Sequence, residues 1–316
     1  MMHKIIYTAT AAIIMAATAS GAEWMTDLEA AKTKAKAEGK AVLIDFTGSD
    51  WCGWCVRLRQ TILDTPQFQQ YAADKFVLME VDVPRNAAKI GAELHARNKG
   101  ITRQYGITTF PSMLVLTPEG EVVGGFIGGR DTMEHVIAPL NEALSTQARM
   151  TEARRLQGEA RAKALMQIYE ALPETLHPYF RHLQEEIAQN DPHNATGIHT
   201  RIAELNRMAE IESLSQTQDT DYAAVMAKFD KAYAEASAEN KNKIQRMRLN
   251  YLEKLQHHLV MNAATTEDVL ELKKLLLLTA EYSAPSDAEA LRQEINTMFQ
   301  NPEEVLNSLK MKQQEK

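Results

Sequence analysis

The chain has 316 residues, of which 45% are hydrophobic and 24% are charged, and its formal net charge is −7. This length corresponds to about two average domains, and the composition is that of a globular protein able to bury a sizeable core. The charges are spread along the chain and form no basic patch, so a nucleic-acid partner is not expected.

The first 22 residues have the pattern of an export signal. Lys4 supplies an early positive charge, residues 5–19 form an uncharged and mostly apolar run, and residues 20–22 are small. The run of about 15 residues is shorter than the ~20 that a membrane-spanning helix needs, and an uncleaved anchor is the alternative. We therefore expect a signal peptide at 1–22 and a periplasmic or otherwise exported protein.

The next segments alternate between helical and strand patterns. A helix is expected from Thr26, which has capping-box spacing with Glu29, to the stop at Gly39. Residues 41–46 and 76–82 are almost wholly apolar, which is typical of strands covered on both faces.

Further elements follow in the same region. A helix that contains the cysteines is expected to run through Leu63, and a polar helical pattern covers 86–105. A strand at 112–117 is followed by a turn at 118–120 and a hairpin partner at 121–127.

A last helix of this region is expected to begin at Asp131, which has capping-box spacing with Glu134. Its apolar residues recur at helical spacing and are Val136, Ile137, Leu140 and Leu144. The predicted order is helix, strand, helix, strand, helix, strand, strand, helix.

From about residue 150 onward the pattern is helical throughout. Glycine becomes rare, and two apolar stripes have helical spacing, one at Ile244, Met247, Tyr251, Leu255 and Leu259 and the other at Val269, Leu272, Leu275 and Leu276. The turn at 190–194 resembles those of helical-hairpin repeats, although no sustained repeat period is present. An all-α region is therefore predicted, with repeat-like helical hairpins as an alternative.

The two cysteines of the chain both lie in the segment Trp51-Cys52-Gly53-Trp54-Cys55. A bridge across so short a loop stabilises a fold little, so reactivity is the better reason for the pair. The segment follows a predicted strand and opens a helix, where amide N–H groups and the helix macrodipole stabilise a thiolate on Cys52. Cys55 lies one helical turn away and can resolve a mixed disulfide.

The sequence around the pair argues against most other roles of paired cysteines. A zinc site needs two more ligands, and the nine histidines have no spacing that places a pair beside the cysteines. Covalent haem attachment needs a histidine where the chain has Val56. A structural disulfide is the remaining alternative. Solvent exposure or capping is the expected role of the histidines at 177, 182, 193, 199, 257 and 258, and neither a metal nor a cofactor is expected.

The strand at 41–46, the segment FTGSDWCGWC at 46–55 and the segment YGITTFP at 105–111 resemble the thioredoxin superfamily, especially the thioredoxin-like proteins of bacterial envelopes. The resemblance covers about residues 24–148 and implies a central mixed sheet flanked by helices. It also implies a cis bond before Pro111, whose loop faces the cysteine pair. The substrate-binding candidates are Trp51, Gly53, Trp54, Phe110 and Pro111.

The resemblance further implies that Asp45 is the buried acid that relays the proton of Cys55. Asp45 lies seven residues before Cys52, one more than is usual in the family, and Glu80 occupies the position of thioredoxin's partner lysine. An aspartate at a strand end that faces solvent is the alternative.

The charges and the dipeptide around the cysteines leave the redox direction open. Gly-Trp separates the cysteines, in contrast to Gly-Pro in thioredoxin and Pro-His in strong periplasmic oxidants. Asp50 is expected to oppose the Cys52 thiolate, whereas Arg57 and Arg59 favour it.

The sequence thus predicts an α/β thioredoxin-like domain at 23–148 and an α-helical domain at 149–316. The predicted function is thiol-disulfide exchange in the cell envelope, with Cys52, Cys55 and Asp45 as catalytic residues. Expected partners are exported proteins with disulfides, a membrane electron donor or other redox partner, and a protein partner or second copy bound by the helical region. The alternative is an envelope scaffold whose helical region binds a partner and whose thioredoxin-like domain has little redox activity.

Overall fold

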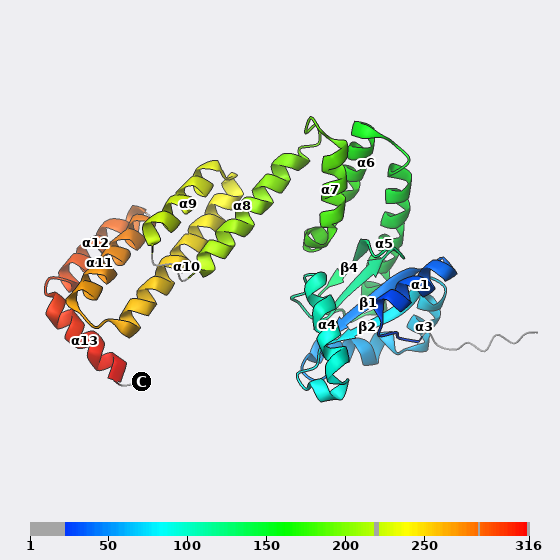
Figure 1. Cartoon of the computed structure of the whole chain (residues 1–316), viewed down its shortest axis with the longest axis horizontal. Helices are drawn as coiled ribbons and strands as arrows, with labels where there is room; N and C mark the ends of the chain where they lie inside the picture. The colour runs from blue at the N-terminus through cyan, green and yellow to red at the C-terminus, as the bar shows by residue number, and fades with distance from the viewer. Residues whose placement is uncertain (1–22, 218–220, 284, 315–316) are drawn as a thin grey trace, which may run out of the picture. The chain divides into compact units, whose positions relative to one another are not determined.

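A computed structural model of the chain describes residues 23–217, 221–283 and 285–314 (Figure 1). The predicted signal peptide at 1–22 lies outside these described residues. The chain forms two compact units, one ending at Ile198 and the other beginning at His199. The predicted domain boundary at 148/149 falls within helix α5 (Met133–Ala153) rather than between these units.

Four strands of the first unit form a mixed sheet with the order β2-β1-β3-β4. Strand β1 (Ala41–Thr47) is parallel to β2 (Phe76–Asp82) and antiparallel to β3 (Ser112–Leu116), which is antiparallel to β4 (Val122–Ile127). Each strand agrees with its predicted range to within one residue at either end. Every residue of β1 and β3 is buried, as expected for strands with helices over both faces.

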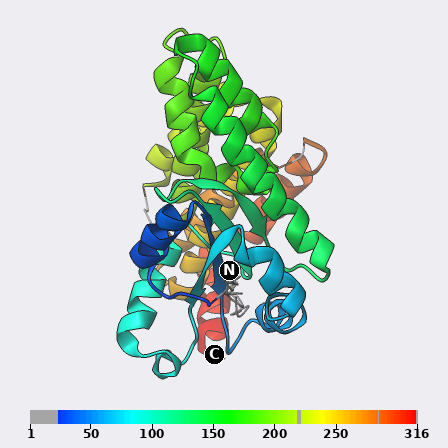
Figure 2. The ribbon, with the colours of Figure 1, turned by 90° about the vertical axis from the view of Figure 1, so that its right-hand side faces the viewer.

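Helices cover this sheet on two sides. In Figure 2, α1 (Leu28–Glu38) and α4 (Ala92–Gln104) lie on one side, and α3 (Pro66–Ala73) and α5 lie on the other. Helix α5 packs closely on β4, since a Cβ atom at Gly124 would lie 2.5 Å from that of Ala143. The mixed sheet flanked by helices has the thioredoxin-like arrangement that the sequence predicts.

Two predicted helix caps were one residue early. Helix α1 follows Asp27 and α5 follows Thr132, and each side chain accepts a hydrogen bond from the amide three residues further on. Thr26 and Asp131 therefore do not cap these helices. The reason is that the capping oxygen must reach the N3 amide, and Asp27 and Thr132 meet that condition.

The predicted single helix from the cysteines through Leu63 is divided in the structure. Helix α2 (Gly53–Leu58) leads into a π-helical turn, η1 (Arg59–Leu63), in which the Asp64 amide donates to the Arg59 carbonyl oxygen at 2.9 Å. Helix α3 was not predicted and begins with Pro66 after the N-cap Thr65. A 3₁₀ turn, η2 (Ala87–Lys89), precedes α4.

The first unit continues beyond the sheet through α6 (Gly158–Glu170), the 3₁₀ helix η3 (Glu174–Phe180) and α7 (Arg181–Asn190). Helix η3 packs on β4. Arg154 pairs with Glu121 at 2.8 Å and with Glu186 at 2.6 Å, and Glu186 also binds Arg161. These contacts join the first helices of the predicted helical region to the sheet.

The second unit is helical throughout its described residues. Its helices are α8 (Ile198–Gln216), α9 (Tyr222–Glu235), α10 (Ala238–Asn262), α11 (Thr266–Glu281), α12 (Pro285–Met298) and α13 (Pro302–Gln314). Their lengths range from 13 to 25 residues, and no repeat of fixed length is evident among them. No described helix of the protein combines the length and apolar content needed to cross a bilayer.

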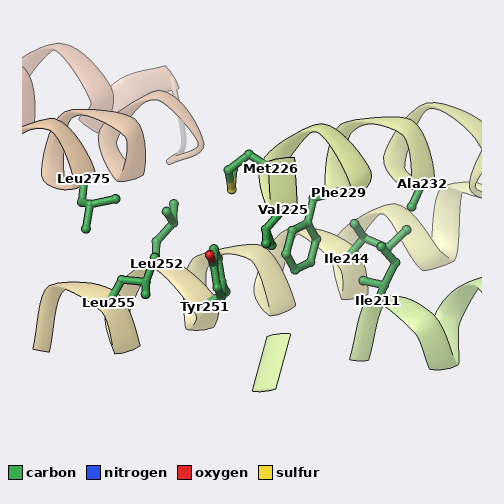
Figure 3. Packing of buried hydrophobic residues seen from close by; sticks show 10 residues of the cluster. All are labelled: Ile211, Val225, Met226, Phe229, Ala232, Ile244, Tyr251, Leu252, Leu255 and Leu275. Carbon is green, nitrogen blue, oxygen red and sulfur yellow. The ribbon is translucent and has the colours of Figure 1, made fainter. Parts of the chain in front are cut away.

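Both predicted apolar stripes contribute to the cores of this unit. The first core joins α8, α9, α10 and α11 and contains Phe229, Ile244, Tyr251 and Leu255 (Figure 3). Val269 and Leu272 belong to a second core with residues of α12 and α13. The stripes therefore serve packing, as the helical spacing predicted.

Candidate active site

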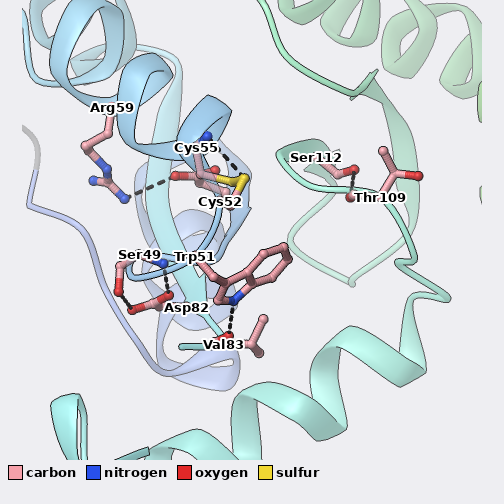
Figure 4. The surroundings of a disulfide bond; sticks show 10 residues. Ser49, Trp51, Cys52, Cys55, Arg59, Asp82, Val83, Thr109 and Ser112 are labelled. Carbon is pink, nitrogen blue, oxygen red and sulfur yellow. Dashed lines mark hydrogen bonds and ion pairs between the residues drawn. A yellow bond between two sulfur atoms is a disulfide. The ribbon is translucent and has the colours of Figure 1, made fainter. Parts of the chain in front are cut away.

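Cys52 and Cys55 form a disulfide at the start of helix α2 (Figure 4). Their Cα atoms are 5.2 Å apart, within the usual range for a disulfide. Cys52 is the N-cap residue, and its Sγ atom accepts a hydrogen bond from the Cys55 amide at 3.2 Å. This is the position predicted from the sequence, at the positive end of the helix where a thiolate is stabilised.

Two carboxylates fix the loop that leads into the cysteine pair. Asp82, at the end of β2, accepts hydrogen bonds from the amide and hydroxyl of Ser49 at 2.8 and 2.6 Å. Asp50 accepts from the amides of Arg85 and Asn86 at 2.8 and 3.1 Å, and these donors lower the pKa of its carboxyl. The Asp50 charge thus has backbone partners, and its predicted effect on Cys52 stays a prediction.

Trp51 lies between the disulfide and Val83 in Figure 4. Its indole N–H donates to the Val83 carbonyl oxygen at 2.9 Å, and its ring meets that of Phe110 edge-on at 5.2 Å. The Phe110–Pro111 bond is cis, as the resemblance implied. The structure therefore brings the cis-proline segment against the residue that precedes Cys52.

Trp54 is the most exposed aromatic side chain beside the disulfide, with 53% of its surface accessible. The Trp54 ring lies against Gly129, since a Cβ atom added at Gly129 would be 2.6 Å from the indole. The guanidinium carbon of Arg57 lies 5.6 Å from the centroid of the Trp54 ring. Trp54 also forms one wall of a hollow of about 570 Å³ with Gly129, Arg130, Asp131, His135, Ala138 and Pro139. The lining of this hollow therefore combines apolar residues with the charged Arg130 and Asp131.

Asp45 is buried in the sheet and is only 2% exposed. Burial raises the pKa of its carboxyl to about 7, aided by the nearby charges of Glu80 and Asp82 and opposed by the Arg59 guanidinium. Arg59 Nη2 lies 3.1 Å from Asp45 Oδ2 and also binds Glu80. The alternative of a solvent-facing Asp45 is therefore wrong, since β1 is covered along its whole length.

Two features of this cluster were not predicted. Arg59, the first residue of η1, reaches the carboxylates and supplies the cation that Glu80, the register partner of Asp45, cannot supply. The ring of Trp24 lies 4.4 Å from the Arg59 guanidinium carbon. The neighbourhood of Asp45 and Glu80 could be predicted once the register of β1 and β2 is known. No sequence pattern indicates that Trp24 lies beside Arg59.

Comparisons with known proteins match the first part of the chain. Residues 23–118 match a family model described as thioredoxin-like. The disulfide bond reductase DsbH of Chlamydia pneumoniae is 31% identical over 103 residues, which are 33% of this chain and 61% of that protein. The thioredoxin-related protein DsbJ of the same organism is 29% identical over 96 residues, 30% of this chain and 27% of that protein. The matched segments thus span less than two thirds of either relative.

Solved structures are matched over similar lengths. A DsbH oxidoreductase structure is 25% identical, covers 45% of this chain and 94% of its own, and has a TM-score of 0.35. The oxidised C-terminal domain of Neisseria meningitidis DsbD is 20% identical, covers 37% of this chain and 96% of its own, and has a TM-score of 0.28. By the match to the family model, residues 23–118 of this chain, which carry the disulfide and the buried Asp45, form a thioredoxin-like domain.

Proposed function

We propose that this protein is a thiol-disulfide oxidoreductase of the cell envelope that acts on protein disulfides through Cys52 and Cys55. The observation that carries the proposal is a disulfide at the N-terminus of α2, where the Cys52 sulfur accepts a hydrogen bond from the Cys55 amide and the preceding Trp51 contacts Phe110. A helix N-terminus stabilises a thiolate and makes Cys52 the better attacking group.

The reaction begins with the dithiol form of the protein. The Cys52 thiolate attacks a client disulfide, a mixed disulfide forms, and the other client sulfur leaves as a thiolate. Cys55 then loses its proton to Asp45 and attacks Cys52, which restores the Cys52–Cys55 disulfide and releases the client as a dithiol. Two electrons pass to the client in each cycle.

The direction of exchange and the partners belong to the same proposal. Similarity to a protein named a disulfide bond reductase favours the reducing direction. A reductase needs a source of electrons, and for an exported protein we propose a dithiol donor in the membrane. The signal pattern at 1–22 supports export and clients that are themselves exported.

The exposed aromatic side chains near the disulfide favour a polypeptide substrate over a small-molecule thiol. Trp51 and Trp54, which directly precede Cys52 and Cys55 in the sequence, are exposed, and the partly buried Phe110 contacts Trp51. Gly53, where an added Cβ atom would meet nothing within 4 Å, leaves room for a client backbone. We propose that these residues and Pro111 contact the polypeptide on either side of the client cysteine.

A trapping experiment tests the function. Cys55→Ser, reduced and offered disulfide-containing envelope proteins, should accumulate mixed disulfides through Cys52, because the resolving thiol is missing. The species are counted on non-reducing gels after alkylation and should disappear on addition of a strong reductant.

Cys52→Ser is the matched control, since it keeps one thiol at the same helix but lacks the attacking one. It should trap few clients or none. Equal trapping by both variants, or trapping by neither, would contradict the proposal and favour the alternative of a scaffold with little redox activity.

A further inference from the structure

Arg59 joins two carboxyl groups of neighbouring strands beside the active-site helix. Its Nη2 atom donates hydrogen bonds to the carboxylates of Asp45 in β1 and Glu80 in β2. These two residues lie opposite each other in the parallel register. The Nη1 atom of Arg59 lies 3.8 Å from Asp64. One cation is thus shared by a fully buried acid, a partly buried acid and an exposed acid.

The first described residues hold this cation in place. The amide of Met25 donates to the Leu78 carbonyl oxygen at 2.9 Å, and the Glu80 amide donates to Met25 at 2.8 Å, so this segment runs along the outer edge of β2. The pairing places the Trp24 ring 4.4 Å from the Arg59 guanidinium carbon. A cation over an aromatic face is attracted to it, so Trp24 restricts where the Arg59 charge can lie.

The π-helical turn contributes to the same placement. It begins at Arg59, immediately after α2, and the Asp64 amide closes its wider turn on the Arg59 carbonyl oxygen. Such turns are frequent at functional sites. Arg59 is 20% exposed, so its charge acts in a partly desolvated setting.

The two oxygens of Asp45 differ in their surroundings. Oδ2 accepts from Arg59, whereas Oδ1 is buried and has no hydrogen-bond partner among the described residues. One oxygen is therefore oriented by the cation and the other is available to take a proton.

We propose that Arg59, held by Trp24 and shared with Glu80, is a positioning residue that sets the pH above which Asp45 can accept the proton of Cys55. This inference rests on the proposed function, since it concerns the second half of the exchange. The charged groups that face Asp45 are Arg59, the first residue of η1, and Glu80 and Asp82 on β2.

The sign of each charge fixes the expected effect. Arg59 favours the carboxylate form of Asp45, so removing its charge keeps Asp45 protonated to a higher pH and slows proton transfer at neutral pH. Glu80 disfavours that form, so removing its charge has the opposite effect. If Arg59 and Glu80 had only structural roles, replacing one or the other would not shift the pH profile of this step in opposite directions.

The test uses the full chain, reduced and mixed with dithiobis(nitrobenzoate), a symmetric aromatic disulfide. Cys52 attacks first and releases one thionitrobenzoate. Cys55 then gives its proton to Asp45 and bonds to Cys52, while the bond to the second thionitrobenzoate breaks and its electron pair leaves with that group. The rate of this second release is followed by absorbance in stopped flow between pH 5 and 9.

The rate of the second release should rise with pH, and the two charge variants should shift the pH midpoint of that rise in opposite directions. Arg59→Met should raise the midpoint by about one pH unit or more, the effect of losing an opposite charge at this distance. Glu80→Gln should lower the midpoint. Trp24→Ala should raise it by less than Arg59→Met does, while Arg59→Lys and Trp24→Phe should stay near the parent protein.

The two phases separate this inference from the proposed function. A normal first phase with an unchanged midpoint in both Arg59→Met and Glu80→Gln would overturn the inference and leave the function standing. A parent protein with no first phase would overturn the function itself. If Arg59→Met fails to fold, Glu80→Gln decides alone, because a midpoint that does not fall contradicts the shared-cation arrangement.

Discussion

Asp45 shows how burial converts an ordinary acid into a group that titrates near neutral pH. Its pKa of about 7 arises mainly from desolvation, and the Arg59 guanidinium only partly opposes it. A pKa near the working pH allows a group to accept and return a proton with little driving force in either direction. The same burial has a consequence for stability.

Because the pKa of Asp45 is raised on folding, the protonated form is favoured in the folded state. Its contribution to stability is fully present below the unfolded pKa of about 4 and is lost as the pH rises through about 7. We expect Asp45→Asn to be the more stable protein at pH 8, by at most about 4 kcal/mol at 1.36 kcal/mol per unit. Urea unfolding from pH 4 to 8 measures the difference.

Asp50 provides the matched control for this prediction. It is exposed and its pKa is lowered by backbone donors, so its contribution is present above the unfolded pKa and is lost as the pH falls. Asp50→Asn should therefore keep the loss of stability that the parent protein shows between pH 4 and 8. If Asp45→Asn also keeps that loss, Asp45 is not its source.

At the scale of elements, the last two strands of the sheet depend on a glycine. Gly125 has φ +135°, and a Cβ atom there would lie 2.0 Å from the Met113 carbonyl oxygen. Gly125→Ala must therefore separate β3 from β4, and we expect a loss on the order of 3 kcal/mol, as is typical of severe backbone strain and overpacking. The fall in Tm measures it.

Gly100 is a suitable comparison because Gly100→Ala adds the same single methyl group as Gly125→Ala. It lies in α4, its φ is helical, and a Cβ atom there would meet nothing within 4 Å. Gly100→Ala should raise stability by up to about 1 kcal/mol, since alanine is the better helix former. A Tm that is equal in both variants would argue against the close β3–β4 contact.

The local sequence pattern predicted some elements of the first unit well and others poorly. Strand ranges were correct to within one residue because a buried strand needs a mostly apolar run, and β1 is apolar except for Asp45 and Thr47. The break after Leu58 was missed because nothing in the local pattern distinguishes a π-helical turn from a continued helix. Helix α3 was missed although Thr65-Pro66 is a usual helix start.

At the scale of the whole molecule, the change in composition near residue 150 and the end of the first compact unit at Ile198 do not coincide. Leu176 and Phe180 of η3 are buried, and η3 packs on β4. Arg154 links Glu121 of the sheet hairpin to Glu186 of α7. Helix η3 therefore packs on the thioredoxin-like sheet, and Arg154 links α7 to the hairpin of that sheet.

Two truncated chains test this arrangement. A chain ending at residue 198 should unfold in one cooperative transition, whereas one ending at 148 should lose about 3 kcal/mol or more, because removal of large buried side chains costs this much. Its Tm should fall by roughly 10 °C, given about 4 °C for each kcal/mol in a domain of this size. Equal melting temperatures would show that residues 149–198 add nothing to the first unit.

The sequence alone determined the place of the cysteine pair and most of the architecture. The Cys52–Cys55 spacing, the apolar strands and the helical stripes are local patterns, and local patterns follow from backbone geometry and burial. Only the tertiary structure decided which charges meet. Asp45, Arg59, Glu80 and Trp24 are brought together by strand register and chain direction, and these depend on packing between segments that are distant in the sequence.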